Sequence, residues 1–381
     1  MSLPVRVMRA HRPVAAAFLA AATAALSLSG CTADEKGDSG DGPQIEARLL
    51  PPIVDPGPKP RKPKQADVAI EGTVDPVDEG GTVTLQVHDG DAWTDLDSAE
   101  QDAEGSVGFT APNLVDGETQ SYRLAVGEHH SDDLDTGVWQ DKLEFEDQFN
   151  GDSLGSTWHH RLQGYAAESR SCSRPDTSMV DVSGGVAALS VDLDSERSDR
   201  CSYDGTKYDY RLNANIGTQG QFSFRYGYAA ARMKFHEKRG QHAAFWMQPE
   251  HPADGGDPRD AGAEIDVVEW FGHPHHSGLA SYVHYRDEDG PQKIGDWITD
   301  PDQYGDKWWK KYHVFSVEWS PEGYTFRIDG QVTSVIDEAV SGVPEFLILS
   351  NLSSDYELAK LPSESDLPQT SYVDWVRVWN L

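Results

Sequence analysis

Two stretches of the chain contain short runs in which apolar and polar residues alternate. In residues 66–130, the run Val83–Val87 alternates with a period of two, which predicts a half-buried β-strand. Similar runs occur at Val107–Phe109 and Tyr122–Val126, and Asp-Gly and Gly-Gly pairs separate the runs. Because such pairs favour tight turns, the pattern predicts a small β-sandwich with no helix.

The second stretch, residues 143–381, has many strand-length runs, frequent turn signals and little helical periodicity. This combination predicts a large, mostly antiparallel β-sandwich. Alternation also assigns faces within single strands. Phe245 and Met247 are expected to point into the core, which places Trp246 on the opposite face.

A second strand supports the same division of faces. In the run Tyr282–Tyr285, the apolar Val283 is expected in the core together with Tyr285. Alternation then places Tyr282 and His284 on the open face.

One strand-like run, Glu264-Ile265-Asp266-Val267-Val268-Glu269, holds three carboxylates within six residues. In a regular strand, Glu264 and Asp266 share one face, whereas Glu269 would point into the apolar side. A lone carboxylate buried among core residues is costly. One extra residue, a β-bulge near Val268, returns Glu269 to the face of the other two.

Carboxylates on one face suit the hydrolysis of a glycosidic bond, which needs a proton donor and a second carboxylate. A retaining mechanism holds the two carboxyl groups about 5–5.5 Å apart. Asp266 would hydrogen-bond one of the outer residues and help to keep them in different protonation states. The alternative is a solvated acidic face on an edge strand.

The motif Glu-Ile-Asp-Val-Val-Glu resembles the bulged catalytic signature of glycoside hydrolase family 16, which includes laminarinases, lichenases and agarases. The resemblance extends over roughly Leu143 to Leu381, and further segments follow the family order: Phe145–Gly151, Tyr226–Gly227, Ala244–Met247, Ile328–Gly330 and Tyr372–Trp379. It implies an all-β, concanavalin-like β-jelly roll in which the substrate lies across a concave sheet.

The resemblance also implies roles for the three carboxylates. Glu264 would be the nucleophile, and Glu269 would be the general acid and then the general base. Asp266 would act between them as an electrostatic partner.

Further site residues follow from the same resemblance and from the predicted faces. Trp246, Tyr282 and His284 are expected to line the cleft, and Trp297 is expected to stack on a sugar ring. Asp374 matches a position that often binds a structural calcium ion, with a simple hydrogen-bonding Asp as the alternative. No other cofactor is expected.

Acidic residues dominate the composition. The chain has 64 Asp and Glu against 32 Lys and Arg, a formal net charge of −32. Such a charge argues against nucleic acids and anionic membranes as partners. It also argues against sulfated polysaccharides, unless basic residues gather in the cleft, whereas neutral sugar polymers are unaffected.

The N-terminal sequence has the pattern of an export signal. The segment Leu28–Cys31 resembles a bacterial lipobox and follows the apolar run Val14–Leu28, which is too short to span a bilayer comfortably. Residues 1–31 are therefore predicted to be a lipoprotein signal peptide. The mature protein would be anchored by Cys31 to the outer face of a bacterial membrane, with ordinary secretion as the alternative. Membrane association is expected through this anchor alone.

The remaining cysteines, Cys172 and Cys201, form an even pair in an exported chain. Exported proteins favour disulfides, so these two residues are predicted to be joined.

The composition also divides the chain into domains. Residues 32–65 are rich in Asp, Gly and Ser and then in Pro, which predicts a disordered, extended linker. Residues 66–130 resemble bacterial immunoglobulin-like modules and would act as a spacer, or would bind carbohydrate through Trp93. Residues 131–142 are predicted to be a second linker before the catalytic domain at 143–381.

Two departures from the family pattern bear on the substrate. Ala230 stands where many relatives carry Glu, and Gln241–Ala243 replace a Gly-Leu-Trp-Pro-like approach to the next strand. The expected function is a monomeric, endo-acting, retaining hydrolase of β-linked polysaccharide, with β-1,3-glucan as the leading substrate. Alternatives are a β-1,3-1,4-glucanase, galactanase, agarase or transglycosylase, and a non-catalytic glycan-binding surface protein.

Overall fold

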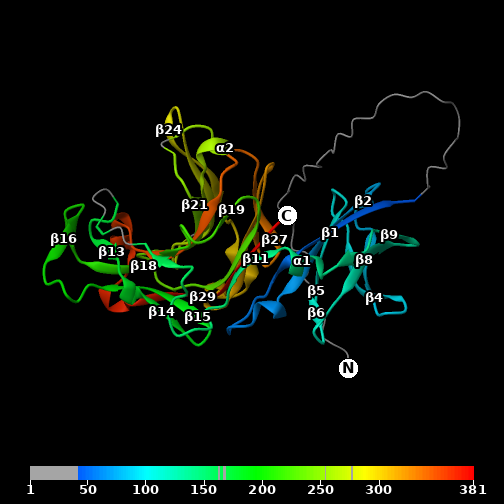
Figure 1. The fold of residues 1–381 in the computed structure, drawn as a ribbon, viewed down its shortest axis with the longest axis horizontal. Helices are drawn as coiled ribbons and strands as arrows, with labels where there is room; N and C mark the ends of the chain where they lie inside the picture. The colour runs from blue at the N-terminus through cyan, green and yellow to red at the C-terminus, as the bar shows by residue number, and fades with distance from the viewer. Residues whose placement is uncertain (1–41, 162–163, 166–168, 254, 276–277) are drawn as a thin grey trace. The chain divides into compact units, whose positions relative to one another are not determined.

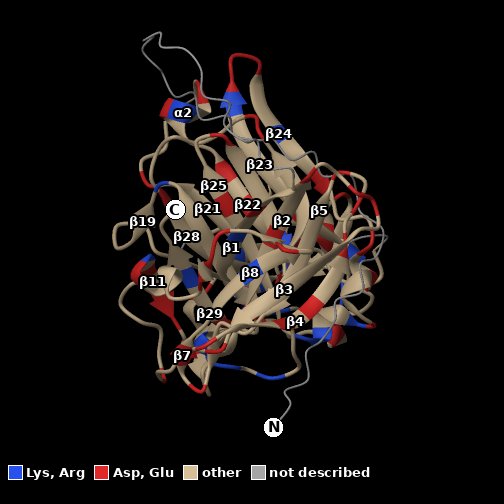
Figure 2. Ribbon diagram, turned by 90° about the vertical axis from the view of Figure 1, so that its right-hand side faces the viewer, with Lys and Arg blue, Asp and Glu red and all other residues tan. Residues whose placement is uncertain are grey.

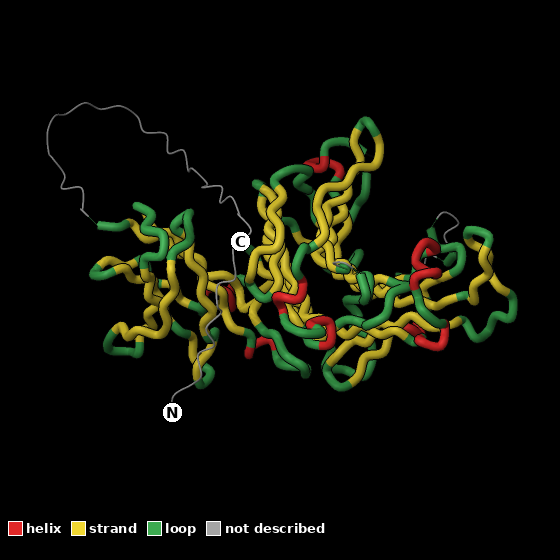
Figure 3. Tube along the Cα trace, turned by 180° about the vertical axis from the view of Figure 1, so that it is seen from behind, coloured by secondary structure: helices red, strands yellow, loops and turns green. Residues whose placement is uncertain are grey.

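The computed structural model describes residues 42–161, 164–165, 169–253, 255–275 and 278–381. The predicted signal peptide with Cys31, and the first part of the predicted linker, lie outside the described residues. Strands dominate the described chain, and its helices are short (Figure 3). None of the helices in these ranges is both long and apolar enough to cross a membrane.

The chain divides into two compact units (Figure 1). The smaller unit comprises the described residues up to Leu49, together with Ile70–Ala111 and Thr119–Asp135. The larger unit comprises Leu50–Ala69, Pro112–Glu118 and Thr136–Leu381. The two units therefore alternate along the sequence.

Strands of the smaller unit form two sheets. One has the order β1-β2-β5, and the other has the order β10-β8-β3-β4, with β9 paired to β8. The bounds are β1 Gln44–Val54, β2 Asp67–Asp75, β3 Thr82–His88, β4 Trp93–Glu100, β5 Ser106–Ala111, β8 Ser121–Val126, β9 His129–His130 and β10 Leu134–Asp135. Val83, Leu85 and Leu124 are fully buried, as their alternation with polar neighbours predicts.

The larger unit is a sandwich of two curved, predominantly antiparallel sheets. The first sheet has the order β14-β15-β29-β20-β25-β26-β27, with β11 also paired to β29. Its strands are β11 Leu143–Asp147, β14 Val180–Ser183, β15 Val186–Leu193, β20 Gly227–Lys234, β25 His313–Ser320, β26 Gly323–Ile328, β27 Gln331–Ile336 and β29 Gln369–Trp379.

The second sheet has the order β18-β28-β21-β22-β23-β24 and is joined to the first through a short β15–β18 pairing. Its strands are β18 Arg211–Gly217, β21 His242–Pro249, β22 Glu264–Trp270, β23 Leu279–Asp287, β24 Gly290–Trp297 and β28 Glu345–Leu352. Shorter elements are β6 Leu114–Val115, β7 Glu118–Thr119, β12 His159–His160, β13 Ser173–Pro175, β16 Arg200–Tyr203, β17 Thr206–Asp209, β19 Ser223–Phe224, α1 Val138–Asp141, α2 Pro258–Ala261 and the 3₁₀ helix η5 Asp355–Lys360.

The main core lies between these two sheets. Phe245, Met247 and Val283 from the second sheet pack in one apolar cluster with residues of the first sheet such as Phe315 and Val317. The predicted inward faces of β21 and β23 are therefore confirmed. Their outward faces remain open to form a site.

The Pro-rich segment is ordered, in contrast to the predicted linker over residues 32–65. Gln44–Val54 form β1, and the side chains of Leu50 and Ile53 are fully buried. Prolines lower strand propensity but are tolerated at strand edges and ends, and the apolar residues between them gain free energy on burial. Residues 50–69, named here the N-terminal strap, belong to the larger unit.

A buried arginine fastens the strap to the sandwich. Arg232 of β20 donates from Nε to the Asp55 carbonyl at 2.7 Å, and its Nε lies 3.1 Å from Asp55 Oδ2. Its Nη1 donates to Asp374 Oδ2 of β29. Gly57 and Tyr312 exchange two backbone hydrogen bonds nearby. The strap is therefore held against β20 by Arg232 and against the residue before β25 by the hydrogen bonds between Gly57 and Tyr312.

The predicted second linker, residues 131–142, also contains structure. Ser131 and Thr136 are buried, β10 lies between them, and α1 follows. The polar composition of this segment suggested exposure to solvent. Thr136 can nevertheless be buried, because its hydroxyl donates to the Asn113 carbonyl at 2.8 Å and this hydrogen bond offsets much of the cost of removing the hydroxyl from water.

The predicted disulfide is confirmed, since Cys172 and Cys201 are bonded. The backbone amides of Ser171 and Cys172 donate to the Asp355 carboxylate at 2.8 and 3.0 Å. These contacts hold the segment before β13 against η5, and both segments reach the site described next.

Candidate active site

The three carboxylates lie on β22, a central strand between β21 and β23. Across β21, Phe245 pairs with Val268 and Trp246 with Asp266, so one residue of β22 is extra. The same shift occurs against β23 between Asp266 and Glu269. The predicted bulge is therefore confirmed. Both valines after Asp266 are buried in the core, which leaves Glu269 free to rejoin the outer face.

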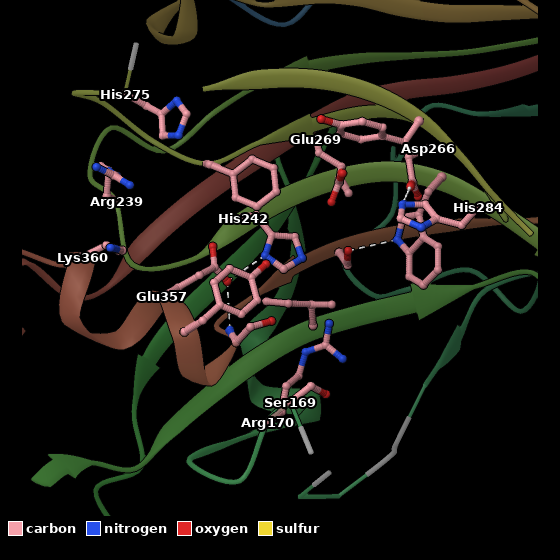
Figure 4. A pocket seen from close by; sticks show the side chains of 18 of the residues that line it. Ser169, Arg170, Arg239, His242, Asp266, Glu269, His275, His284, Glu357 and Lys360 are labelled. Carbon is pink, nitrogen blue, oxygen red and sulfur yellow. Dashed lines mark hydrogen bonds and ion pairs between the residues drawn. The ribbon is translucent and has the colours of Figure 1, made fainter. Parts of the chain in front are cut away.

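All of the sequence-predicted cleft residues line one cavity of about 520 Å³, and Figure 4 labels Asp266, Glu269 and His284 among them. The lining includes the carboxylates and the aromatic and histidine positions named above: Glu264, Asp266, Glu269, Trp246, Tyr282, His284 and Trp297. Asp374 and the two disulfide cysteines lie elsewhere. The open face of β21, β22 and β23 is thus a concave site.

Glu264 is held by a neutral amide. Gln248 Nε2 donates to Glu264 Oε2 at 2.7 Å, and Arg161 Nη2 donates to Gln248 Oε1 at 2.8 Å. The Arg161 guanidinium also lies 5.3 Å from the ring centroid of Trp246. This chain of contacts orients Glu264 toward the cavity.

Asp266 is buried between the other two carboxylates. Burial, followed by the negative charges of Glu264 and Glu269, raises the pKa of Asp266 well above its ordinary value. His284 Nε2 lies 3.2 Å from Asp266 Oδ2. A protonated Asp266 can donate a hydrogen bond to a neighbouring carboxylate, so it can separate two groups that would otherwise repel.

Glu269 has the electrostatic setting of a general acid. Burial raises its pKa, while the positive charges of His242 and His284 oppose that rise and the carboxylates of Glu264 and Glu357 reinforce it. The net result is a pKa above the ordinary value for Glu. Such a group keeps a proton nearer to neutral pH and can deliver it to a leaving group.

Sequence reasoning missed the basic lining of the cavity. Acidic positions are spread over many strands and loops (Figure 2), yet four Lys and Arg side chains line this cavity: Arg170, Arg239, Lys293 and Lys360. They come from separate loops, from β24 and from η5, so no local motif contains them. His242 and Glu357 were likewise missed as a pair because 115 residues separate them.

Two groups of side chains contain potential metal ligands. Ligand atoms of Glu264, Asp266 and His284 lie within 4.8 Å of one another, but they are also the groups that acid–base chemistry would use, so we assign no metal there. At the predicted calcium position, Asp374 pairs with the Arg232 guanidinium and accepts from the Arg61 amide at 2.9 Å. A fixed cation beside this carboxylate does not fit a calcium ligand, and we assign no calcium to it.

A two-sheet sandwich with a bulged acidic strand lining its cavity has the carboxylate set that an O-glycosyl hydrolase needs. The chain belongs to glycoside hydrolase family 16, because residues 139–381 match the family model described as "Beta-porphyranase A-D, GH16 domain".

Individual relatives with a known activity share about a quarter of the aligned residues with this chain. The chain is 25% identical over 270 residues to "Glucan endo-1,3-beta-glucosidase A1" of Niallia circulans, with 62% of this chain and 37% of that protein aligned. It is 27% identical over 175 residues to "Keratan-sulfate endo-1,4-beta-galactosidase" of Sphingobacterium multivorum, with 44% and 39% aligned. The chain thus spans well under half the length of both proteins.

Solved structures show the same fold. The crystal structure of LamAcat from Zobellia galactanivorans aligns with a TM-score of 0.51 at 18% identity, covering 64% of this chain and 100% of that chain. At this identity the likeness supports the jelly-roll fold and carries no information on substrate.

Proposed function

We propose that the protein is an endo-acting, retaining glycoside hydrolase that cleaves β-linked polysaccharide by double displacement. The observation that carries this proposal is the bulged β22, which presents Glu264 and Glu269 on one cavity face with Asp266 between them. A non-catalytic glycan-binding protein would have no use for this arrangement.

In the proposed reaction, Glu264 attacks the anomeric carbon while Glu269 protonates the departing glycosidic oxygen. This step gives a covalent glycosyl-enzyme and leaves Glu269 ionised. Glu269 then removes a proton from water, and the water oxygen displaces Glu264 with net retention of configuration. Asp266 stabilises Glu264 and Glu269 by changing its hydrogen bonds as the negative charge moves from one carboxyl group to the other.

The first candidate polymer is β-1,3-glucan. The name of the Niallia circulans relative supports it, and neutral sugar rings suit the aromatic surfaces of Trp246 and Trp297 in the cavity. Planar aromatic side chains pack well against the apolar faces of sugar rings while their polar edges remain hydrogen-bonded, as Trp246 Nε1 is to Ser350 Oγ at 3.0 Å.

A second candidate, a sulfated β-galactan, is favoured by a specific observation. The cavity gathers Arg170, Arg239, Lys293 and Lys360 in a chain whose formal net charge is −32. Four acidic residues, Glu264, Asp266, Glu269 and Glu357, line the same cavity, so basic and acidic residues are equal in number there. Basic residues therefore gather in the cleft of a strongly acidic chain, which is the condition under which an anionic polysaccharide becomes a suitable substrate. The description of the family and the name of the Sphingobacterium multivorum relative point the same way.

A hydrolysis screen separates the two candidates. The polymers are laminarin, barley glucan, galactan, agarose, porphyran and keratan sulfate. For a sulfated substrate, kcat/KM should fall steeply between low and high NaCl because salt screens the attraction, and Lys360→Gln should lower it several-fold. Lys207→Gln, a control on exposed β17 outside the cavity, should change nothing. Preference for laminarin with no salt dependence would exclude the sulfated candidate.

We further propose that the protein is monomeric and that its smaller unit is a spacer. We also propose that the protein is exported and anchored to a membrane by a lipid on Cys31. The lipobox-like Leu28–Cys31 supports the anchor. Cys31→Ser should move the protein from the membrane fraction to the medium, measured by fractionation and immunoblotting. Lys207→Gln, on the exposed β17, leaves both the lipobox and the disulfide intact and is the control. An unchanged membrane fraction for Cys31→Ser would rule the anchor out.

A further inference from the structure

His242, the first residue of β21, is locked in place at the floor of the cavity. Its side chain is buried, and its Nδ1 lies 2.8 Å from Glu357 Oε2. The ring stacks on Phe271 with centroids 5.2 Å apart. Glu357, on η5, is also buried and accepts from the Ser354 amide at 2.9 Å. Both members of the pair are therefore fixed by several contacts.

The pair lies directly beside the acid/base carboxylate. Ala244 pairs with Glu269 across β21 and β22, and residues two apart on a strand share a face. His242 therefore lies on the same face as Ala244. Figure 4 shows its imidazole ring between the carboxyl groups of Glu357 and Glu269, and all three side chains line the cavity.

Charged neighbours determine whether the imidazole ring of His242 is protonated. Burial acts to lower the pKa of His242, but the Glu357 carboxylate, its hydrogen bond and the Glu269 charge outweigh burial, so the pKa lies above its ordinary value. Arg170, from the segment before β13, opposes this rise. The remaining facing groups are Asp266 on β22 and His236 after β20, which interact electrostatically with the ring.

We propose that His242 and Glu357 form a positioning pair in which the imidazolium of His242 stabilises the carboxylate form of Glu269. The inference rests on the proposed acid/base role of Glu269. It gives a function to a segment, Gln241–Ala243, that departs from the family pattern.

The chemistry requires such a counter-charge. When Glu269 gives its proton to the leaving oxygen, a new anion forms in a largely buried position that already faces Glu264, Asp266 and Glu357. Without a facing cation, Glu269 would hold its proton too tightly to act as an acid. The imidazolium lowers the free energy of that anion, and Glu357 keeps the imidazole protonated despite its burial. The proton later returns to Glu269 from the attacking water.

The test is a titration of Glu269 in the full-length protein without substrate. Carboxyl carbons are followed by ¹³C NMR, and the Glu269 resonance is identified by its loss in Glu269→Gln. We expect His242→Gln to raise the pKa of Glu269 by roughly one unit, because it removes a facing positive charge and leaves Glu357. Glu357→Gln should give a smaller change, because the anion is removed and the buried ring loses its proton as well.

His236→Gln is the matched control. His236 is a buried histidine, hydrogen-bonded to Ser371 Oγ at 3.1 Å, and burial lowers its pKa to about 3, so it carries no charge at neutral pH. Its replacement should leave the Glu269 titration unchanged. In active protein, the basic limb of the kcat/KM profile should move with the NMR value for His242→Gln alone.

An unchanged Glu269 titration in folded His242→Gln protein would overturn the inference, as would an equal shift in His236→Gln. A higher KM with no shift in titration would also overturn it and would make His242 a substrate contact. If His242→Gln does not fold, Glu357→Gln decides, because a Glu269 shift of about one unit or more in that variant would overturn the inference. If the wild-type protein hydrolyses no polymer, the proposed function fails. The Glu269 titration needs no substrate, so it still shows whether His242 stabilises the Glu269 carboxylate.

Discussion

Glu264→Ala is expected to lower hydrolysis by on the order of 10⁴-fold or more, the scale on which the loss of a nucleophile is felt. The cavity left by the side chain opens the anomeric carbon to small anions from the side that Glu264 occupied. Because Glu269 still supplies a proton, added azide should restore turnover and give a glycosyl azide of inverted configuration. The product is identified by ¹H NMR of the anomeric proton.

Glu269→Ala should differ from Glu264→Ala both in the size of the rate loss and in the configuration of the azide product. Glu264 is intact, so substrates with good leaving groups should still form the covalent intermediate, while natural polymers lose roughly 10²–10⁴-fold in rate. Azide then attacks the intermediate and gives a product of retained configuration. Asp266→Asn should slow turnover less than either change.

Glu237→Gln provides the control, since this carboxylate pairs with Lys310 at 2.9 Å and does not line the cavity. Exchange of the two azide stereochemistries would reverse the assignment of the roles of Glu264 and Glu269. Full activity in both alanine variants would remove β22 from the mechanism.

Arg232→Met is expected to cost about 3–5 kcal/mol in the free energy of unfolding, the usual penalty for breaking a buried ion pair from one side. The substitution removes the buried cation that Asp55 and Asp374 share, and it leaves Asp55 paired only with the partly exposed Arg61. Burial already raises the pKa of both carboxyl groups despite Arg232, so removing the guanidinium should raise both further. The loss should be read from urea unfolding at several pH values.

The pH dependence has a definite sign. A carboxyl group whose pKa is higher in the folded than in the unfolded state costs stability as pH rises through its folded pKa. The deficit of Arg232→Met should therefore be largest near neutral pH and should shrink toward pH 4. Arg200→Met breaks a largely exposed pair with Asp209 and should cost less than about 1 kcal/mol. Equal losses in the two variants would contradict the buried-pair argument.

The acidic strand was predictable because physical constraints act locally on it. A lone Glu269 among core residues is too costly, which forces the bulge, and simple alternation assigns Trp246 and His284 to the cleft. The basic lining and the His242–Glu357 pair were not predictable, since loops and η5 bring them together only after the sandwich forms. The prolines of the strap led to the prediction of a disordered linker. The apolar Leu50 and Ile53 between and beside them were the better indication that this segment is buried.

The strap has a consequence for how the enzyme can be isolated in pieces. The family match begins at residue 139, yet the larger unit also contains Leu50–Ala69. A recombinant fragment cut at the family boundary would leave the buried Arg232 without Asp55 and would lose the two backbone hydrogen bonds between Gly57 and Tyr312. We expect such a fragment to aggregate, and to regain solubility when a synthetic peptide of residues 50–69 is added in trans.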